Sequence, residues 1–109
     1  MRYNRHMAEY VKAIKKSVLS SGAKKSVFVS GKHLMIANVA GEFFAIDDTC
    51  SHAGCSLGAE GMLKGNTVTC GCHGSQFDVG SGRVLNPPAS ANQASYKVKV
   101  EGDDVLVLV

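Results

Sequence analysis

The sequence predicts an all-β domain, either a sandwich or a small barrel of short antiparallel strands. Two observations lead to this prediction. Glycine recurs at short intervals beside serine, alanine, asparagine or aspartate, in combinations that favour tight turns. The stretches between these turns are short, and they are either apolar throughout or alternate apolar with polar residues. With 109 residues, the chain has the usual size of a single domain.

Six short segments have the pattern of β-strands. They are residues 26–29, 33–39, 43–46, 67–69, 96–100 and 105–108. Only the pairs at 30–31 (Ser-Gly) and 40–41 (Ala-Gly) separate the first three segments, which predicts an antiparallel meander joined by tight hairpins. The last two segments flank Gly-Asp-Asp at 102–104, which predicts a further hairpin.

The N-terminal region has a different pattern. Apolar side chains recur there at three- and four-residue intervals with lysines opposite, at Met7, Tyr10, Val11, Ile14 and Val18. This spacing is the helical period and predicts a helix over residues 10–18. We expect residues 1–9 to form a poorly ordered extension, so that the domain itself runs over residues 10–109.

The composition excludes several classes of protein. Apolar residues make up 45% of the chain and charged residues 19%, as in an ordinary soluble globular protein. No apolar run is long enough to cross a bilayer, and the N-terminus lacks a secretory pattern, so we expect a cytoplasmic monomer without a membrane anchor. The net charge of +3 comes from a lysine-rich N-terminal third without interleaved aromatic residues, which indicates a solvated face and no nucleic-acid site.

The central part of the chain contains a cluster of cysteine and histidine residues. The motif Cys50-x-His52 is followed by residues 53–69 and then by Cys70-x-x-His73. Each motif offers one thiolate and one imidazole, so two loops together could hold a two-iron cluster with both sulfurs on one iron and both nitrogens on the other. The same four residues could also form a zinc site in a structural module.

The residues around the two motifs carry a family resemblance. Segments 50–55 (CSHAGC) and 70–78 (CGCHGSQFD) resemble the two cluster-binding boxes of the Rieske family, and 45–48 and 82–89 resemble its preceding strand and its proline loop. The resemblance implies a Rieske-type antiparallel β-sandwich or barrel, with a small cluster-binding subdomain of two loops at about 47–89. It also implies an edge strand at 10–14, in conflict with the helical pattern there.

The resemblance further implies the cofactor, one Rieske-type [2Fe-2S] cluster held by Cys50, His52, Cys70 and His73. A protein of this kind is a one-electron carrier and not an enzyme, and its partners are a donor and an acceptor redox protein. Neutral imidazole ligands raise the potential above that of clusters held by four cysteines. Oxidation of the iron would promote loss of the free imidazole proton, so we expect proton-coupled redox at the two histidines.

Two further cysteines lie one in each box. By resemblance to cytochrome bc-type Rieske proteins, Cys55 and Cys72 are expected to form a disulfide between the two loops. Two free thiols, or two more ligands of a zinc site, are the alternatives. The disulfide would fit a protein of moderately high potential, which is nearest to the sulredoxin type of archaea.

Four other residues are expected to surround the cluster. By resemblance, Ser75 donates a hydrogen bond to a bridging sulfide, whereas Phe77 replaces a tyrosine that donates one in high-potential relatives. Gly74 allows the backbone to approach the sulfides closely, and Pro87 belongs to a stiff loop that covers the cluster. The sequence therefore predicts a stand-alone Rieske ferredoxin. The alternative, a ferredoxin component of a Rieske oxygenase system, is disfavoured by Cys55 and Cys72.

Overall fold

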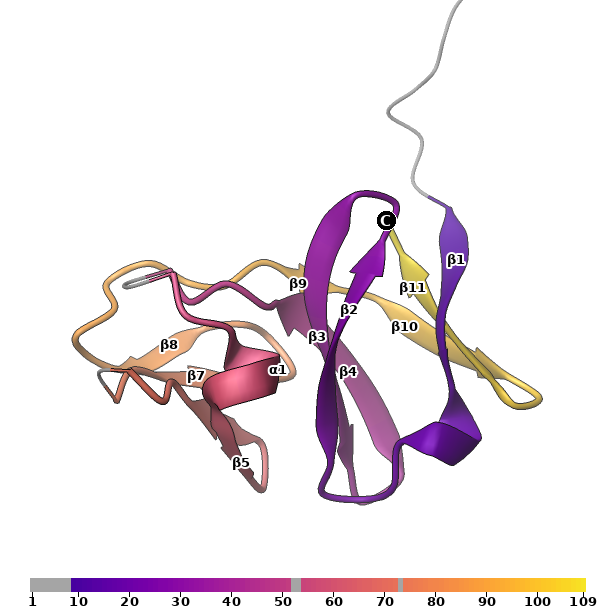
Figure 1. The fold of residues 1–109 in the computed structure, drawn as a ribbon, viewed down its shortest axis with the longest axis horizontal. Coiled ribbons are helices and arrows are strands. Elements are labelled where there is room, and N and C mark those ends of the chain that lie inside the picture. Colours follow the sequence, from indigo (N-terminus) through magenta and orange to yellow (C-terminus); the bar gives the residue numbers. More distant parts are fainter. Residues whose placement is uncertain (1–8, 52–53, 73) are drawn as a thin grey trace, which may run out of the picture.

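The computed structural model describes residues 9–51, 54–72 and 74–109. Its strands form three antiparallel sheets with the orders β1-β11-β10, β2-β3-β4-β9 and β5-β6-β7-β8. The strands are β1 (Tyr10–Lys15), β2 (Lys24–Val29), β3 (Lys32–Val39), β4 (Glu42–Asp47), β5 (Met62–Lys64), β6 (Thr67–Thr69), β7 (Gln76–Asp78), β8 (Val84–Asn86), β9 (Ser95–Tyr96), β10 (Val98–Glu101) and β11 (Asp104–Leu108). The first two sheets form the base of the molecule, and the third forms a separate lobe at one end (Figure 1). The all-β antiparallel prediction is confirmed.

The predicted meander is present, with two-residue hairpins at the Ser-Gly and Ala-Gly pairs that predicted them. Val29 pairs with Lys32 across residues 30–31, and Val39 pairs with Glu42 across residues 40–41. All four turn residues have positive φ, between 51° and 91°. This left-handed conformation matches the twist of the flanking strands, and glycine in the second position adopts it without steric cost.

The helix predicted over residues 10–18 is wrong, whereas the edge strand implied by the family resemblance is confirmed. Strand β1 pairs antiparallel with β11, and only Lys16–Val18 form a single 3₁₀ turn. A helix would have required one buried face, but Val18 is 61% exposed and Tyr10 is 36% exposed. Pairing with the buried strand β11 overrides the local period. Glu9 extends this pairing, because its N–H and carbonyl both bond Val109.

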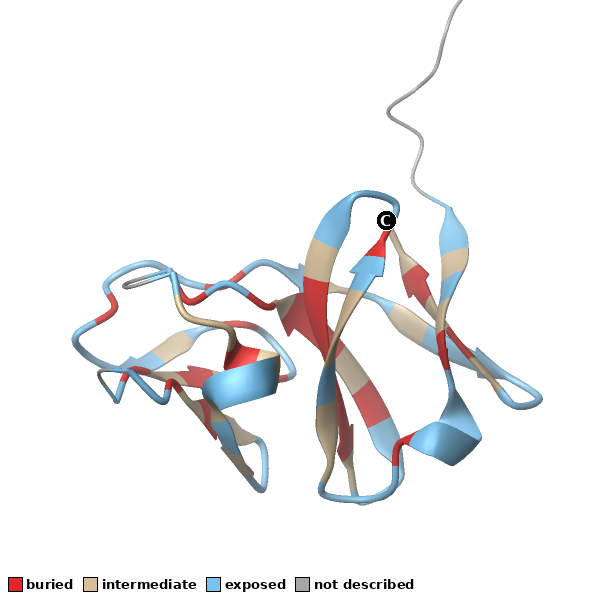
Figure 2. Ribbon diagram, in the orientation of Figure 1, coloured by how far each residue is buried: buried red, intermediate tan, exposed pale blue. Residues whose placement is uncertain are grey.

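Strand β3, an inner strand of the sheet β2-β3-β4-β9, is buried on both faces. In strand β3, Leu34 and Ile36 face the core of the base, while Met35 and Ala37 face the core of the lobe, and all four are fully buried. Buried residues follow one another along β3 and recur in β4 (Figure 2). The predicted strand at 96–100 is split, because β9 pairs with β4 and β10 pairs with β11 on either side of Lys97.

The lobe contains the elements that the sequence pattern did not predict. Strands β5, β7 and β8 have three residues each, which is too short to display a period, and the helix α1 (Leu57–Glu60) has a single turn. Leu57, Val68 and Phe77 are fully buried and form the lobe core with residues of β3 and β4. Within the described residues, no helix is long and apolar enough to cross a membrane.

Candidate metal centre

Two loops carry the cysteine motifs, and their backbones are held in the same way. In the first loop, the Cys50 N–H donates to the Cys55 carbonyl at 2.8 Å, and the Gly54 N–H donates to the Cys50 carbonyl at 3.0 Å. In the second, the Cys70 N–H donates to the carbonyl five residues on at 2.7 Å, and the Gly74 N–H donates back to Cys70 at 3.1 Å. Gly54 and Gly74 both have positive φ, 75° and 82°. The loops are therefore equivalent, with Cys50 and Cys70 in matching positions.

The two matching cysteines are available as ligands. Cys50 and Cys70 lie outside the disulfide, and each is only 2% exposed. Buried thiols that lie at equivalent points of two loops suit a metal cluster that lies between the loops. The predicted histidine ligands, His52 and His73, lie outside the described residues.

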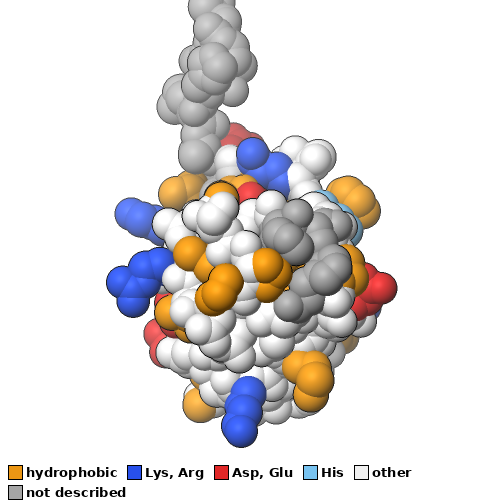
Figure 3. Space-filling view, turned by 90° about the vertical axis from the view of Figure 1, so that its left-hand side faces the viewer, with side chains coloured by type: hydrophobic (Ala, Val, Ile, Leu, Met, Phe, Trp, Pro, Cys, Tyr) orange, Lys and Arg blue, Asp and Glu red, His pale blue; other side chains and the backbone are white. Residues whose placement is uncertain are grey.

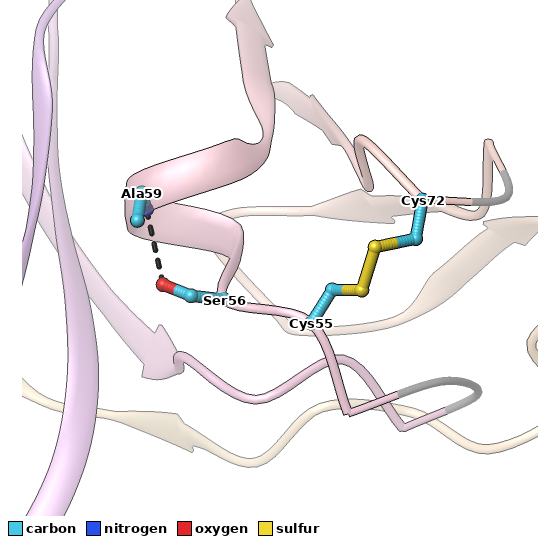
Figure 4. Close-up of a disulfide and its surroundings, with 4 residues drawn as sticks. All are labelled: Cys55, Ser56, Ala59 and Cys72. Atoms are coloured by element: carbon cyan, nitrogen blue, oxygen red, sulfur yellow. Dashed lines mark hydrogen bonds between the residues drawn. A yellow bond between two sulfur atoms is a disulfide. The ribbon is translucent and has the colours of Figure 1, made fainter.

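A disulfide joins the two loops. Cys55, just before α1, is bonded to Cys72, which follows β6 (Figure 4). Their Cα atoms are 6.5 Å apart, within the range that disulfides span. The Sγ atom of Cys70 and the two disulfide sulfurs lie within 4.8 Å of one another. The disulfide therefore lies directly beside a candidate ligand.

The residue after Cys55 fixes the start of the helix. Ser56 is the N-cap of α1, and its hydroxyl accepts a hydrogen bond from the Ala59 N–H at 3.0 Å (Figure 4). A capping serine satisfies a backbone donor that the first helical turn leaves free. The first loop thus ends in a defined turn.

Ser75 is fully buried, and its hydroxyl already accepts the Ala89 N–H at 2.9 Å. A hydroxyl has one proton to donate, and the Ser75 O–H finds no acceptor among the residues that the structure describes. Phe77 is fully buried in the lobe core. Pro87 is exposed, in the loop that leads to Ala89. The bond to Ser75 therefore fastens the end of the proline loop to the second cysteine loop.

The sequence reasoning did not single out Gln93, which is 4% exposed. Its Nε2 donates to the carbonyls of Asp47 and Thr49 at 2.8 and 2.7 Å. Its Oε1 accepts the Ser51 N–H at 2.8 Å. A buried glutamine has no sequence signal of its own, because its partners lie more than forty residues earlier.

The sequence reasoning also did not single out Asp48, which is fully buried behind the first loop. Its Oδ1 accepts the Ser26 hydroxyl at 2.6 Å and the Gly58 N–H at 2.7 Å. Its Oδ2 lies 3.3 Å from Nε2 of His33 and makes no hydrogen bond among the described residues. The pKa of Lys24 lies below its usual value, because burial lowers it by more than the nearby Asp48 carboxylate raises it.

Comparison with known proteins identifies the family. The sequence model of the Rieske [2Fe-2S] domain matches residues 9–97. The chain belongs to the Rieske family. A relative in Pseudomonas aeruginosa, the ferredoxin component of a naphthalene 1,2-dioxygenase system, is 34% identical over 91% of this chain and 94% of that protein. The biphenyl dioxygenase ferredoxin subunit of Pseudomonas sp. strain KKS102 is 37% identical over 90% of each chain.

A solved structure has the same fold. The ferredoxin of carbazole 1,9a-dioxygenase from Nocardioides aromaticivorans IC177 matches this Rieske protein with a TM-score of 0.86 and 27% identity, over 90% of this chain and 95% of that one. These relatives are ferredoxin components, so this Rieske protein is an electron carrier and not an enzyme. The family match also excludes the alternative of a structural zinc module.

The described residues fit the [2Fe-2S] cluster that the Rieske domain implies. Cys50 and Cys70 supply two buried sulfurs from matching loops, and thiolates are the ligands that iron–sulfur clusters require. Ser75 has a buried hydroxyl whose proton is uncommitted, beside the second loop. The donor set and the paired loops are therefore consistent with this cofactor.

Proposed function

We propose that this Rieske protein is the ferredoxin component of an aromatic-ring dioxygenase system. It receives one electron from a reductase and passes it to a terminal oxygenase. The observation that carries the proposal is its similarity to such components over at least 90% of both chains, with both cysteine loops in place. A related ferredoxin has been solved as a complex with the oxygenase of carbazole 1,9a-dioxygenase, at 30% identity to this chain.

The proposed ligands are Cys50, His52, Cys70 and His73. The cluster supplies a reversible change of one electron. The chain holds the loops that carry the ligands, through the matched hydrogen bonds of Cys50 and Cys70 and through the Cys55–Cys72 disulfide. We place the cluster-binding part at about 47–89 in a domain that runs over 10–109.

The comparisons favour an oxygenase ferredoxin over the stand-alone Rieske ferredoxin that the sequence predicts. From the sequence, Cys55 and Cys72 argued against an oxygenase ferredoxin, but the similarity to oxygenase ferredoxins over nearly the whole chain outweighs a single pair of cysteines. A moderately high potential and proton-coupled redox at His52 and His73 remain predictions. Ser75 favours a raised potential, whereas Phe77 lacks the hydroxyl that would raise it further.

The surface at the lobe end suits transient docking of a redox partner. Figure 3 views this end, where several hydrophobic side chains are exposed in the middle of the face and charged side chains lie mainly toward the rim. The proline loop contributes exposed Leu85, Pro87 and Pro88. An apolar centre with a charged rim is typical of protein interfaces.

Two experiments test the proposal. The first is electron paramagnetic resonance (EPR) of the reduced protein, which should show the rhombic signal of a nitrogen-ligated [2Fe-2S] cluster. His52→Cys and His73→Cys should change or abolish this signal, whereas His6→Ala, far from the loops in the sequence, should preserve it. A colourless protein that contains zinc would refute the cofactor, and an unchanged signal in both ligand variants would refute the ligands.

The second experiment tests the partner. The chemically reduced protein is mixed rapidly with an oxidised terminal oxygenase of an aromatic-ring dioxygenase, and the reoxidation of the ferredoxin is followed by absorbance. Reoxidation within seconds supports the proposal. If several such oxygenases leave the protein reduced while a small oxidant such as ferricyanide reoxidises it, the oxygenase role is wrong. Redox titration across pH then measures the potential and its proton coupling.

A further inference from the structure

The segment that follows the proline loop contacts both cysteine loops. The Ala89 N–H donates to the Ser75 hydroxyl of the second loop at 2.9 Å. Two residues later, the Ala91 carbonyl accepts the Ser51 hydroxyl of the first loop at 2.6 Å. Residues 89–93 therefore run from one loop to the other, and we call them the strap.

The strap ends at Gln93, whose side chain makes its hydrogen bonds with the first loop. The two Nε2 donors bond the carbonyls of Asp47 and Thr49 at 2.8 and 2.7 Å, and Oε1 accepts the Ser51 N–H at 2.8 Å. Both donors and the acceptor of the amide are thus used. Since Thr49 and Ser51 are the two neighbours of Cys50, one side chain bonds the backbone on both sides of this cysteine.

The backbone of Gln93 is itself fixed. Its N–H donates to the Gly82 carbonyl at 2.7 Å. Gly82 has a φ of 76°, and a Cβ atom there would overlap the Gln93 carbonyl. The strap is therefore packed tightly against the β7–β8 turn, so the Gln93 side chain reaches the first loop from a rigid base.

We propose that Gln93 is a positioning residue for the cluster, because it holds the first loop in the conformation that presents Cys50. The proposal rests on the proposed function, since it takes Cys50 as a ligand. Its consequence is that the loops have two independent fastenings. The Cys55–Cys72 disulfide joins them covalently, and the strap joins them by hydrogen bonds to Ser51 and Ser75.

The test compares Gln93→Met with the wild type and with Asn92→Ala, all as purified holoprotein. Methionine keeps the length of glutamine but makes none of the three hydrogen bonds. Asn92 is the matched control, because its side chain accepts the Val84 N–H of β8 and makes no hydrogen bond with the described part of the first loop. Three quantities are measured: the rate of cluster release to a chelator, the EPR signal of the reduced cluster, and the hydrogen exchange of peptides that contain residues 47–51.

Gln93→Met should release the cluster at least about tenfold faster than the wild type, because three partly buried hydrogen bonds to the backbone around Cys50 are lost together. Exchange in residues 47–51 should rise by about the same factor, and the EPR signal should broaden or shift. Asn92→Ala should leave all three quantities within about twofold of the wild type.

Release, exchange and EPR that match the wild type in folded Gln93→Met would overturn the proposal. Equal effects in Gln93→Met and Asn92→Ala would also overturn it, since the strap would then stabilise the lobe as a whole and the Gln93 side chain would have no specific role at Cys50. If Gln93→Met does not fold, Gln93→Glu replaces it, because it keeps an acceptor for the Ser51 N–H but loses both donors to the Asp47 and Thr49 carbonyls. Cluster release at least about twofold faster than in the wild type would support the proposal, and an unchanged rate would overturn it. Wild-type protein without a Rieske EPR signal would instead refute the proposed function.

Discussion

Replacing Ser75 by alanine tests whether its hydroxyl tunes the cluster. The side chain is fully buried, and its oxygen accepts the Ala89 N–H, which leaves the hydroxyl proton free to bond a sulfur of the cluster. A donor to sulfur stabilises the reduced cluster more than the oxidised one, because the reduced cluster carries one more negative charge. Ser75→Ala should therefore lower the reduction potential.

The size of the shift follows from the strength of such a bond. A hydrogen bond to a charged group contributes about 1.5–3 kcal/mol, and we take the difference between the two oxidation states as about 1–2 kcal/mol. For a single electron, 59 mV corresponds to a tenfold change in equilibrium constant, so the potential should fall by about 45–90 mV. The Ala89 N–H also loses its partner in a buried position, which should cost about 1–3 kcal/mol of folding free energy.

The assay is redox titration of wild type, Ser75→Ala and Ser81→Ala, followed by the EPR signal of the reduced cluster. Ser81 is the control, because its exposed hydroxyl bonds Asp78 in the β7–β8 turn of the same lobe. Its variant should keep the wild-type potential. An unchanged potential in Ser75→Ala with the cluster intact would refute the reasoning, and a loss of stability alone would assign Ser75 a structural role.

Three further predictions concern stability. Cys55→Ser combined with Cys72→Ser should lower the unfolding free energy of the apoprotein by about 3 kcal/mol, because the disulfide closes a loop with a sequence separation of 17. Urea denaturation of the wild type with and without reductant, and of the double variant, measures this difference. Equal urea midpoints for the oxidised wild type and the double variant would contradict it. Gly82→Ala should cost about 2–4 kcal/mol, since φ is 76° and the new Cβ overlaps the Gln93 carbonyl; a urea midpoint close to that of the wild type would count against this packing. Burial, and then a hydrogen bond to the Asp47 carboxylate, raise the pKa of Tyr96 from its usual 10.0 to about 12, so the folded state favours the neutral phenol. This contribution to stability is complete below pH 10 and is lost as pH rises toward 12. Absorbance titration of wild type and Tyr96→Phe checks it, and the absence of a late-ionising phenol in the difference refutes it.

The local parts of the fold could be predicted because their causes are local. Two-residue hairpins need left-handed backbone, and Ser-Gly at 30–31 and Ala-Gly at 40–41 supply it, so both turns and the strands beside them were found. The region 10–18 could not be predicted from its period, because pairing with β11, almost a hundred residues later, decides its conformation. Strands β5, β7 and β8 of the lobe were missed, since three residues are too few to display a period, whereas β6, of the same length, was predicted at residues 67–69 from its β-branched side chains.

The site divides in the same way. The cysteine and histidine motifs are short, so the sequence pattern and the family resemblance together predicted both loops and the pairing of Cys55 with Cys72. Gln93 and Asp48 were not predicted, because a buried polar residue is recognised only by its partners. Gln93 bonds Asp47, Thr49 and Ser51, more than forty residues earlier, and Asp48 bonds Ser26 and Gly58, on either side of it in the sequence. Residues that hold a loop in place therefore remained hidden, whereas the residues on the loop did not.

The two loops share one pattern of hydrogen bonds but are fastened in different ways. The second loop lies between the paired strands β6 and β7 of the lobe, so the sheet itself holds its ends. The first loop joins β4 to α1 and is closed by a single bridge between Thr49 and Ser56 and by the Leu57 N–H, which donates to the Asp48 carbonyl. The side chains of Asp48 and Gln93 add hydrogen bonds to the residues at its two ends. Substitution of Asp48 or Gln93 should therefore loosen the first loop and leave the second loop unchanged. Because a cluster shared between two loops requires both of them to be in position, we expect that loosening the first loop alone is enough to weaken the binding of the cluster.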